Sequence, residues 1–279
     1  MRISFTKMQG AGNDFVVFDA VNHPVEMSRA QIRAIARRRF GVGCDQVLIL
    51  EPAQDREMDF TLRIYNADGG EAEHCGNGIR CIARFVRDRG LARQDQIAIA
   101  TLAGPVYPRI EADGAVTVNM GIPEFDPASV PFEANTRQLV YDLDIDGKQV
   151  PISVLSLGNP HAVQLVEELD DATVEIQGPL IENHRRFPRR VNAGFMQVVD
   201  RRHIRLRVHE RGVGETMACG TGATAAVVAG RQRGLLEEAV DVTLPGGVLK
   251  VAWKGEREPA YLSGPAVTTY EGSVDLERL

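Results

Sequence analysis

The sequence has little of several features that would place it in a specialised class. It lacks a basic excess, since 32 Lys and Arg face 38 Asp and Glu for a net charge of −6, whereas binding to a nucleic-acid backbone demands positive charge. No run approaches the roughly 20 apolar residues of a membrane span, and Met1–Phe5 has no signal-peptide pattern. We therefore expect a cytoplasmic protein that binds neither nucleic acid nor membranes.

Cysteine and lysine are also scarce. The cysteines are Cys44, Cys75, Cys81 and Cys219, and the lysines are Lys7, Lys148, Lys250 and Lys254. Four cysteines in 279 residues are too few for a secreted disulfide framework, and no pair has the close spacing typical of a zinc site. No lysine lies in a setting typical of a pyridoxal phosphate enzyme. We expect no metal and no cofactor, and any special role of the cysteines is chemical.

The length of the chain lies past the point at which one hydrophobic core stops growing, so two domains are expected. Short β-branched runs between Gly, Pro and Asp turns predict strands at Val47–Leu50, Phe60–Tyr65, Val116–Met120, Ile152–Leu157 and Ile204–Val208. The spacing of apolar residues predicts helices at Ser28–Arg39, Gly78–Arg89 and Gly222–Arg233. Because Ala223–Ala229 is small and apolar on every face, the third helix must be enclosed.

A weak internal repeat is the most informative feature of the sequence. Cys75-Gly76-Asn77-Gly78 opens one predicted helix, and Cys219-Gly220-Thr221-Gly222 opens another about half the chain later. The repeat favours a duplicated domain with a site in the cleft between the copies, and the turn-rich segment Gly121–Pro127 is the expected boundary.

A cysteine at the start of a helix lies beside backbone N–H groups and the positive end of the helix dipole. Both favour the thiolate, so we expect the thiol pKa to fall toward neutrality. The neighbouring glycines let a substrate carboxylate approach the same N–H groups. Two such thiols suit inversion at a carbon acid: a thiolate removes the α-proton from one face, and a thiol delivers a proton to the other.

The other two cysteines are expected to have no chemical role. A single Cys-Gly-x-Gly loop can hold a nucleophile, half of a metal site or merely a buried small residue, and the last is the most common case. Cys81 lies within the second predicted helix and is expected to pack in the core. In Gly43–Gln46 we assign a role to Gln46 and none to the thiol of Cys44.

Polar residues beside predicted turns could complete a site. They are Asn13, Asn66, Asn159, His161, Asn192, Glu210 and Arg211. Each is, taken singly, typical of a turn or a helix cap. Together they could bind a second ammonium and carboxylate, because amides both donate and accept and Arg grips a carboxylate with two bonds. A histidine near a thiol could also bias its protonation.

Several of these motifs resemble those of the diaminopimelate epimerase family along essentially the whole chain. They are Lys7–Phe15, Asn66–Gly70, Cys75–Arg80, Gly158–His161, Glu210–Thr216 and Ala218–Gly222. Gly70 departs from the serine that is usual in the family, which affects only the local turn. The resemblance implies an α/β fold of the α+β type with two similar domains, each a curved, mostly antiparallel sheet or barrel around a central helix. Residues 1–120 plus 265–279 would form the domain of Cys75, and residues 121–264 that of Cys219, with the last strand returning to the first domain.

The resemblance also implies the reaction and the role of each site residue. The chain would convert LL-2,6-diaminopimelate to the meso isomer, a precursor of lysine and peptidoglycan, with Cys75 and Cys219 as base and acid. The implied substrate-binding residues are Asn13, Gln46, Asn66, Gly76, Asn77, Asn159, Asn192, Glu210, Arg211, Gly220 and Thr221. His161 and Glu210 would tune the thiols. Family members form homodimers, and the position of Tyr270 would lie at that contact.

Two other functions stay open at this point. One is a related two-cysteine enzyme such as a proline or hydroxyproline epimerase, although the ring of polar residues favours a substrate with a second charged end. The other is a binding or redox protein whose two thiols form a switch. Exchange of a substrate's α-hydrogen with solvent would distinguish an enzyme from such a switch.

Overall fold

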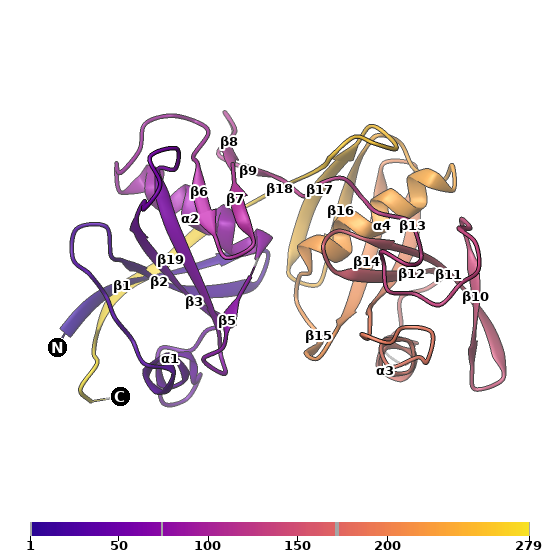
Figure 1. Ribbon diagram of the computed structural model, residues 1–279, viewed down its shortest axis with the longest axis horizontal. Coiled ribbons are helices and arrows are strands. Elements are labelled where there is room, and N and C mark those ends of the chain that lie inside the picture. The colour runs from indigo at the N-terminus through magenta and orange to yellow at the C-terminus, as the bar shows by residue number, and fades with distance from the viewer. Residues whose placement is uncertain (1, 74, 171–172, 279) are drawn as a thin grey trace. The chain divides into compact units, whose positions relative to one another are not determined.

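The computed structural model describes residues 2–73, 75–170 and 173–278. The chain divides into two compact units, Met1–Val118 with Gly264–Leu279 and Asn119–Ser263. In both, the strands of a mixed sheet curve around one long helix, so the fold is α+β as predicted (Figure 1). Within the residues described, none of the helices is long and apolar enough to span a membrane.

The first unit contains one sheet and two helices. Its elements are β1 (Arg2–Gly10), β2 (Asn13–Asp19), α1 (Arg29–Ala36), β3 (Gln46–Pro52), β4 (Phe60–Asn66), β5 (Glu71–Ala72), α2 (Gly76–Asp88), β6 (Ile99–Thr101), β7 (Gly104–Val106) and β19 (Val267–Asp275). The strand order is β19-β1-β2-β3-β4-β6-β7, and β5 pairs with β4. A hairpin of β8 (Arg109–Ile110) and β9 (Val116–Asn119) follows β7 in the chain.

The second unit repeats this plan. Its elements are β10 (Tyr141–Ile145), β11 (Lys148–Ser156), β12 (Pro160–Leu165), a π-helical turn η1 (Thr173–Gln177), α3 (Gly178–Glu182), β13 (Asn192–Asp200), β14 (His203–Glu210), β15 (Gly214–Glu215), α4 (Gly220–Gln232), β16 (Ala239–Leu244), β17 (Gly247–Trp253) and β18 (Ala260–Gly264). Its strands follow the order β10-β11-β12-β13-β14-β16-β17-β18, and β15 pairs with β14.

The two units share one topology, which confirms the duplication predicted from the repeat. In the first unit α1 connects the parallel pair β2 and β3, and α2 connects the parallel pair β4 and β6. In the second unit α3 connects β12 and β13, and α4 connects β14 and β16, again in parallel. The neighbouring pairs β1–β2, β3–β4, β11–β12 and β13–β14 are antiparallel.

The long helix of each unit lies against one face of its sheet, while the short helix covers the other face. In the second unit α4 contacts β11, β12, β13, β14, β16 and β17, and Gly222–Gly230 is buried throughout. Small side chains are needed there because a Cβ on Gly222 would lie 2.9 Å from Val208 Cγ2. The predicted enclosure of this helix is confirmed.

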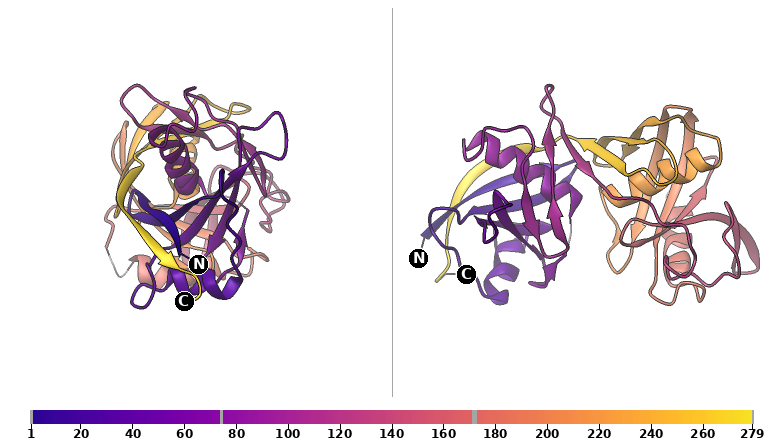
Figure 2. Two further views of the ribbon diagram at one scale, coloured as in Figure 1. Left: turned by 90° about the vertical axis from the view of Figure 1, so that its left-hand side faces the viewer. Right: turned by 45° about the horizontal axis from the view of Figure 1, so that its top comes forward.

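The last strand returns to the first unit, as the family resemblance implied. β19 pairs antiparallel with β1 from Arg2↔Asp275 to Gln9↔Val267, and Figure 2 shows the two strands side by side. On this edge of the sheet the side chains of β19 are mostly exposed.

Two local predictions were wrong. The first predicted helix continued to Arg39, but α1 ends at Ala36 because Arg37 is extended and Arg38 turns back to bind Asp14. The helical segment formed by η1 and α3 was not predicted at all. Its Gly178-Pro179 pair is typical of a turn, and α3 lacks a side-chain cap.

Candidate functional site

Each of the two repeated cysteines is the N-cap residue of the long helix in its unit. Cys75 precedes α2 with an extended backbone, and its Sγ accepts a 3.4 Å hydrogen bond from Gly78 N. Cys219 precedes α4, also with an extended backbone, and its Sγ lies 3.6 Å from Thr221 Oγ1. Because the first N–H groups of a helix have no acceptor within it, both positions suit an anionic group.

Three predicted amide residues of the first unit lie at the end of the sheet nearest Cys75. Asn13 begins β2, Gln46 begins β3, and Asn66 ends β4 directly opposite Gln46 in the strand register. Gln46 Nε2 donates a 2.8 Å hydrogen bond to Asn66 Oδ1. Gln46 Oε1 is buried without a protein partner in the described part of the chain, so its capacity to accept a hydrogen bond is unused there.

The amide of Asn13 is held in one orientation. Its Nδ2 donates to Asp45 Oδ2 at 2.7 Å, and a carboxylate can only accept. Asn13 Oδ1 therefore faces the helix start, where it accepts from Asn77 Nδ2 at 3.2 Å and from Cys75 Sγ at 3.8 Å. The predicted residues Asn13, Cys75 and Asn77 are thus in direct contact.

A charged network that the sequence did not reveal supports this arrangement. Asp14 accepts hydrogen bonds from Lys7 Nζ at 2.6 Å and from Arg38 Nη2 at 2.8 Å, and Arg38 also binds Asp45. Burial alone would raise the pKa of Asp14, but its bonds to Arg38 and Lys7 outweigh burial and lower the pKa to about 2. The available signal was the position of Asp14 and Asp45 beside Asn13 and Gln46 in the sequence.

Arg80, in the helix of Cys75, was also missed. Its side chain is fully buried, and burial lowers the pKa of its guanidinium. Nε donates to Pro265 O at 3.4 Å, while Nη1 and Nη2 have no protein partner in the described ranges. A buried cation with so few partners is costly.

The second unit brings a matching set of residues together. Asn159 precedes β12, Asn192 begins β13, and Glu210 ends β14, so they occupy the topological positions of Asn13, Gln46 and Asn66. Asn159 Nδ2 donates to Thr221 Oγ1 at 3.2 Å. The predicted residues of each unit are therefore gathered at the start of its long helix.

His161 lies behind this group and is neutral. It is fully buried, and burial followed by the charge of Arg211 lowers the pKa of its imidazole to about 3. Its Nε2 is 3.0 Å from Asn159 Oδ1. Since that oxygen can only accept, the neutral ring carries its proton on Nε2. His161 thus fixes the amide that in turn contacts Thr221.

Cys219 is held as a thiol. Burial first, and then the negative charge and hydrogen bond of Glu210, raise the pKa of this thiol well above its ordinary value. The hydroxyl of Thr216 donates to Glu210 Oε1, which keeps the carboxylate in place. The expectation that the helix start would lower the pKa is therefore wrong for Cys219, because desolvation and a nearby anion outweigh the dipole.

Asn192 and Arg211 are linked through the backbone. Asn192 Oδ1 accepts from Arg211 N at 3.0 Å, and Nδ2 donates to Pro160 O at 2.9 Å. The Arg211 residue is exposed, and its Nη1 donates to Arg189 O at 3.3 Å. Asn192 therefore positions the neighbouring turn, whereas the guanidinium of Arg211 is accessible to a ligand.

The other predicted residues fall into two kinds. Cys44 and Cys81 are buried, and burial raises the pKa of each thiol to about 12. The prediction that Cys81 packs in the core is confirmed. Tyr270 lies on β19 with 46% of its surface exposed, and its ring meets Phe5 edge to face.

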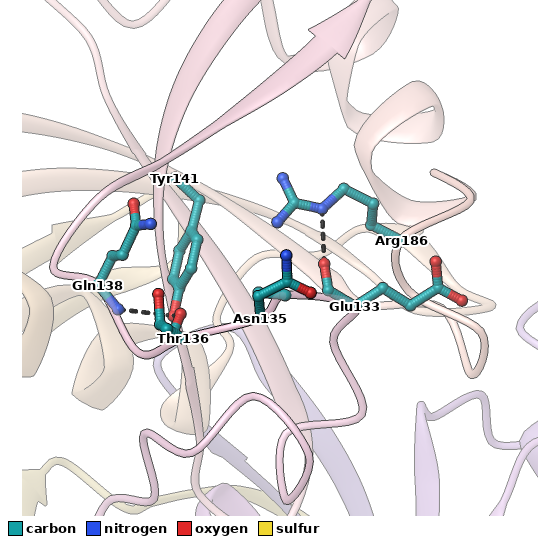
Figure 3. Close-up of a pocket in the computed structure, with 7 residues that line it drawn as sticks. Glu133, Asn135, Thr136, Gln138, Tyr141 and Arg186 are labelled. Atoms are coloured by element: carbon teal, nitrogen blue, oxygen red, sulfur yellow. Dashed lines mark hydrogen bonds between the residues drawn. The ribbon is translucent and has the colours of Figure 1, made fainter.

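A cavity of about 610 Å³ in the second unit contains none of the predicted site residues (Figure 3). It is lined by Glu133, Ala134, Asn135, Thr136, Gln138, Tyr141 and Arg186. Arg186 Nε donates to Glu133 O at 2.8 Å, and the guanidinium lies 4.3 Å from the Phe132 ring centre. Arg186 thus connects two of the segments that line the cavity. Among the residues described, no cluster of three His, Cys, Asp or Glu could hold a metal ion.

Comparison with solved structures defines the class of fold. A hydroxyproline epimerase from Agrobacterium vitis with bound trans-4-hydroxy-L-proline has a TM-score of 0.68 at 15% identity, over 98% of this chain and 92% of the other. A PhzF-family phenazine biosynthesis protein from Bacillus anthracis has a TM-score of 0.66 at 17% identity, over 99% of both chains. The chain has the two-domain fold of these proteins.

Sequence comparison identifies the family. The family model for diaminopimelate epimerase matches residues 5–125 and 153–269. A diaminopimelate epimerase from Nitrosospira multiformis is 56% identical over 277 residues, and one from Alkalilimnicola ehrlichii is 57% identical over 279 residues. Each comparison covers 99% of this chain and 100% of the relative. The chain belongs to the diaminopimelate epimerase family, which confirms the resemblance seen in its motifs.

Proposed function

We propose that this chain is an epimerase that converts LL-2,6-diaminopimelate to meso-diaminopimelate without a cofactor. The observation that carries the proposal is the repeated cysteine: Cys75 and Cys219 have the same topological position in two units of one plan, each at the start of a buried helix. Relatives that are more than half identical over the full chain carry the name diaminopimelate epimerase. The product would serve lysine and peptidoglycan synthesis.

In the proposed reaction the two cysteines exchange roles in each turnover. The Cys75 thiolate takes the α-proton, and the Cys219 thiol gives a proton to the opposite face, which leaves a Cys75 thiol and a Cys219 thiolate. The raised pKa of Cys219 supports its starting form as the thiol. The reverse direction begins from the exchanged pair, so no net proton is gained or lost.

The backbone at both helix starts would bind the reacting carboxylate. Gly76 and Asn77 in α2, and Gly220 and Thr221 in α4, lie in the first turn, where N–H groups point along the axis toward an anion. As the α-proton leaves, charge moves onto the carboxylate oxygens, and the same N–H groups then bind them more strongly. The helix starts therefore favour the enediolate-like state over the substrate.

The remaining polar residues would bind the far end of the substrate and tune the thiols. Those assigned to the substrate are Asn13, Gln46, Asn66, Asn159, Asn192, Glu210 and Arg211. A second ammonium and a second carboxylate are what amide oxygens, a carboxylate and an accessible guanidinium recognise. Glu210 keeps Cys219 protonated, and the neutral His161 orients Asn159 without adding a charge.

We also propose the larger arrangement that this reaction requires. The domains, 1–120 plus 265–279 and 121–264, would close on one substrate so that the two sulfurs approach opposite faces of its α-carbon. A homodimer with Tyr270 at the contact, and a cytoplasmic location, belong to the same proposal.

The direct test is incubation of the protein with LL-diaminopimelate in deuterated water. Meso product carrying deuterium at the inverted α-carbon supports the proposal. Exchange and inversion of proline or hydroxyproline, but not of diaminopimelate, would assign the chain to a related epimerase. Absence of any α-hydrogen exchange, together with reversible oxidation of the two thiols, would instead indicate a redox switch.

A further inference from the structure

A buried carboxylate outside the predicted site contacts the segment that carries Glu210 and Arg211. It belongs to Glu182, the last residue of α3, whose side chain is only 7% exposed. Its oxygens accept bonds from Gly212 N at 2.7 Å, from His209 Nε2 at 3.0 Å and from Arg190 Nη1 at 3.4 Å. A carboxylate this deeply buried needs such donors to remain charged.

Two of the three donors flank the turn that carries Glu210 and Arg211. His209 immediately precedes Glu210, and Gly212 immediately follows Arg211. One carboxylate therefore fixes the residues on both sides of this pair. The turn itself is tight, because Val213 N donates to Glu210 O and Gly212 has a positive φ of 76°.

Packing between α3 and β14 leaves little room for the turn to shift. A Cβ added to Gly178, at the start of α3, would lie 2.8 Å from the His209 side chain. Opposite Glu182, Asn192 Oδ1 accepts from Arg211 N. The turn is thus held from two elements, by the carboxylate of Glu182 in α3 and by the neutral amide of Asn192 in β13.

We propose that Glu182 is a positioning residue whose carboxylate fixes the Glu210–Arg211 turn, so that Glu210 stays beside the Cys219 thiol and Arg211 stays available to the substrate. This inference rests on the proposed function, since it assigns Glu182 to the support of that reaction. The charged and titratable groups facing the carboxylate are His209 of β14 and Arg190. The turn itself carries Glu210 and Arg211, and His161 lies behind it within the influence of the Arg211 charge.

The test measures the protonation of Cys219 directly, without turnover. In a Cys75→Ala background, the rate at which a small methanethiosulfonate modifies Cys219 is followed against pH, and peptide mapping identifies the modified residue. Glu182→Ala should release the turn and speed modification at pH 7 roughly tenfold, the change produced by about one unit of pKa. Glu210→Gln should act similarly, and the double variant Glu182→Ala/Glu210→Gln should add little further.

Matched variants separate positioning from general stability. Glu182→Gln keeps an acceptor for Gly212 N and should leave the pH profile of Cys219 near that of the parent protein. Arg190→Gln removes the longest of the three contacts, which comes from an exposed side chain, and should also leave the pH profile of Cys219 near that of the parent protein. If Glu182→Ala does not fold, His209→Phe keeps the ring against α3, removes one of the two bonds that flank the turn, and should give an intermediate shift.

In the protein with both cysteines intact, Glu182→Ala should lower kcat in both directions, and Glu182→Gln should largely retain it. An unchanged Cys219 profile in Glu182→Ala and in His209→Phe would overturn the proposal. If Glu182→Gln shifted the pH profile of Cys219 as far as Glu182→Ala does, the proposal would be overturned as well. The glutamine keeps the acceptor for Gly212 N and loses only the charge, so such a shift could not come from release of the turn. Failure of the wild-type protein to act on diaminopimelate would refute the proposed function but would leave these thiol profiles interpretable.

Discussion

At the scale of single residues, the two proposed proton-transfer groups have different surroundings. Cys219 lies beside the Glu210 carboxylate, which with burial holds it as a thiol. Cys75 accepts a bond from Gly78 N and contacts the amide of Asn13. Such a difference is useful in a reaction that needs a base on one side and an acid on the other.

The Asp14 carboxylate provides a pH-dependent prediction at this scale. Its folded-state pKa of about 2 lies below the ordinary value of 3.8, so its stabilising contribution is present above about pH 4 and is lost as the pH falls toward 2. Asp14→Asn should therefore lower the free energy of unfolding by about 2 kcal/mol at pH 7, estimated from the size of the pKa shift.

Urea unfolding of Asp14→Asn and wild type between pH 7 and pH 2 would check this. The difference between the two proteins should shrink as the solution becomes acidic. The exposed carboxylate of Glu57 serves as a control, and Glu57→Gln should change little at any pH. A difference for Asp14→Asn that is constant with pH would show that its charge is not what stabilises the fold.

At the scale of elements, the two helix starts are alike in position but not in packing. A Cβ on Gly78 would lie 3.4 Å from Leu48 Cδ2 and 3.5 Å from Cys75 Sγ, which is ordinary contact. A Cβ on Gly222 would lie 2.9 Å from Val208 Cγ2 and 3.2 Å from Cys219 Sγ. The helix of the second unit is thus closer to its sheet at the cysteine.

This difference predicts unequal effects of one substitution at two equivalent positions. Gly222→Ala should destabilise the protein by about 1–3 kcal/mol, as overpacking usually does, and should slow modification of Cys219. Gly78→Ala should be tolerated better by both measures. Thermal unfolding and thiol-modification rates of the pair would check this, and equal effects would contradict the packing difference.

Some features of the helices could be predicted from the sequence and others could not. The starts of α2 and α4 were predictable because Cys-Gly-x-Gly is a local signal, and α4 was expected to be enclosed because its side chains are small on all sides. The contacts of Glu182 could not be predicted from the sequence. The helix α3 has no capping signal, and the Glu182 carboxylate contacts a turn about 30 residues later in the chain. Contacts between residues so distant in sequence have no local pattern.

At the scale of the whole molecule, topology explains why the site residues are so far apart in sequence. Asn13, Gln46 and Asn66 start or end neighbouring strands of one sheet. In the other sheet Asn159 immediately precedes one strand, Asn192 starts the next, and Glu210 ends the third. The family motifs indicated which residues matter, and the repeated strand order explains how each set is gathered. The supporting charges of Lys7 and Arg38 became evident only in three dimensions.

Association of the whole chain gives a further prediction. Tyr270 lies on β19, whose side chains are mostly exposed, at the edge of the sheet of the first unit. Tyr270→Ala should weaken the proposed homodimer because it removes a large aromatic contact. Sedimentation velocity over a range of concentrations would measure this, with Tyr261→Ala, an exposed tyrosine of the other unit, as a control. Equal association of both variants and wild type would remove Tyr270 from the interface.

The central claim is that each cysteine serves one face of the α-carbon, and isomer-resolved deuterium incorporation in Cys75→Ala and Cys219→Ala tests it most directly. Wild type in deuterated water should place deuterium mainly in the inverted product. Each variant should lose epimerisation by at least about 100-fold, the usual contribution of a general acid or base. Each should at most exchange one isomer with retained configuration, and the isomer should differ between the two variants. Inversion at a near-wild-type rate by either variant would contradict the two-base account.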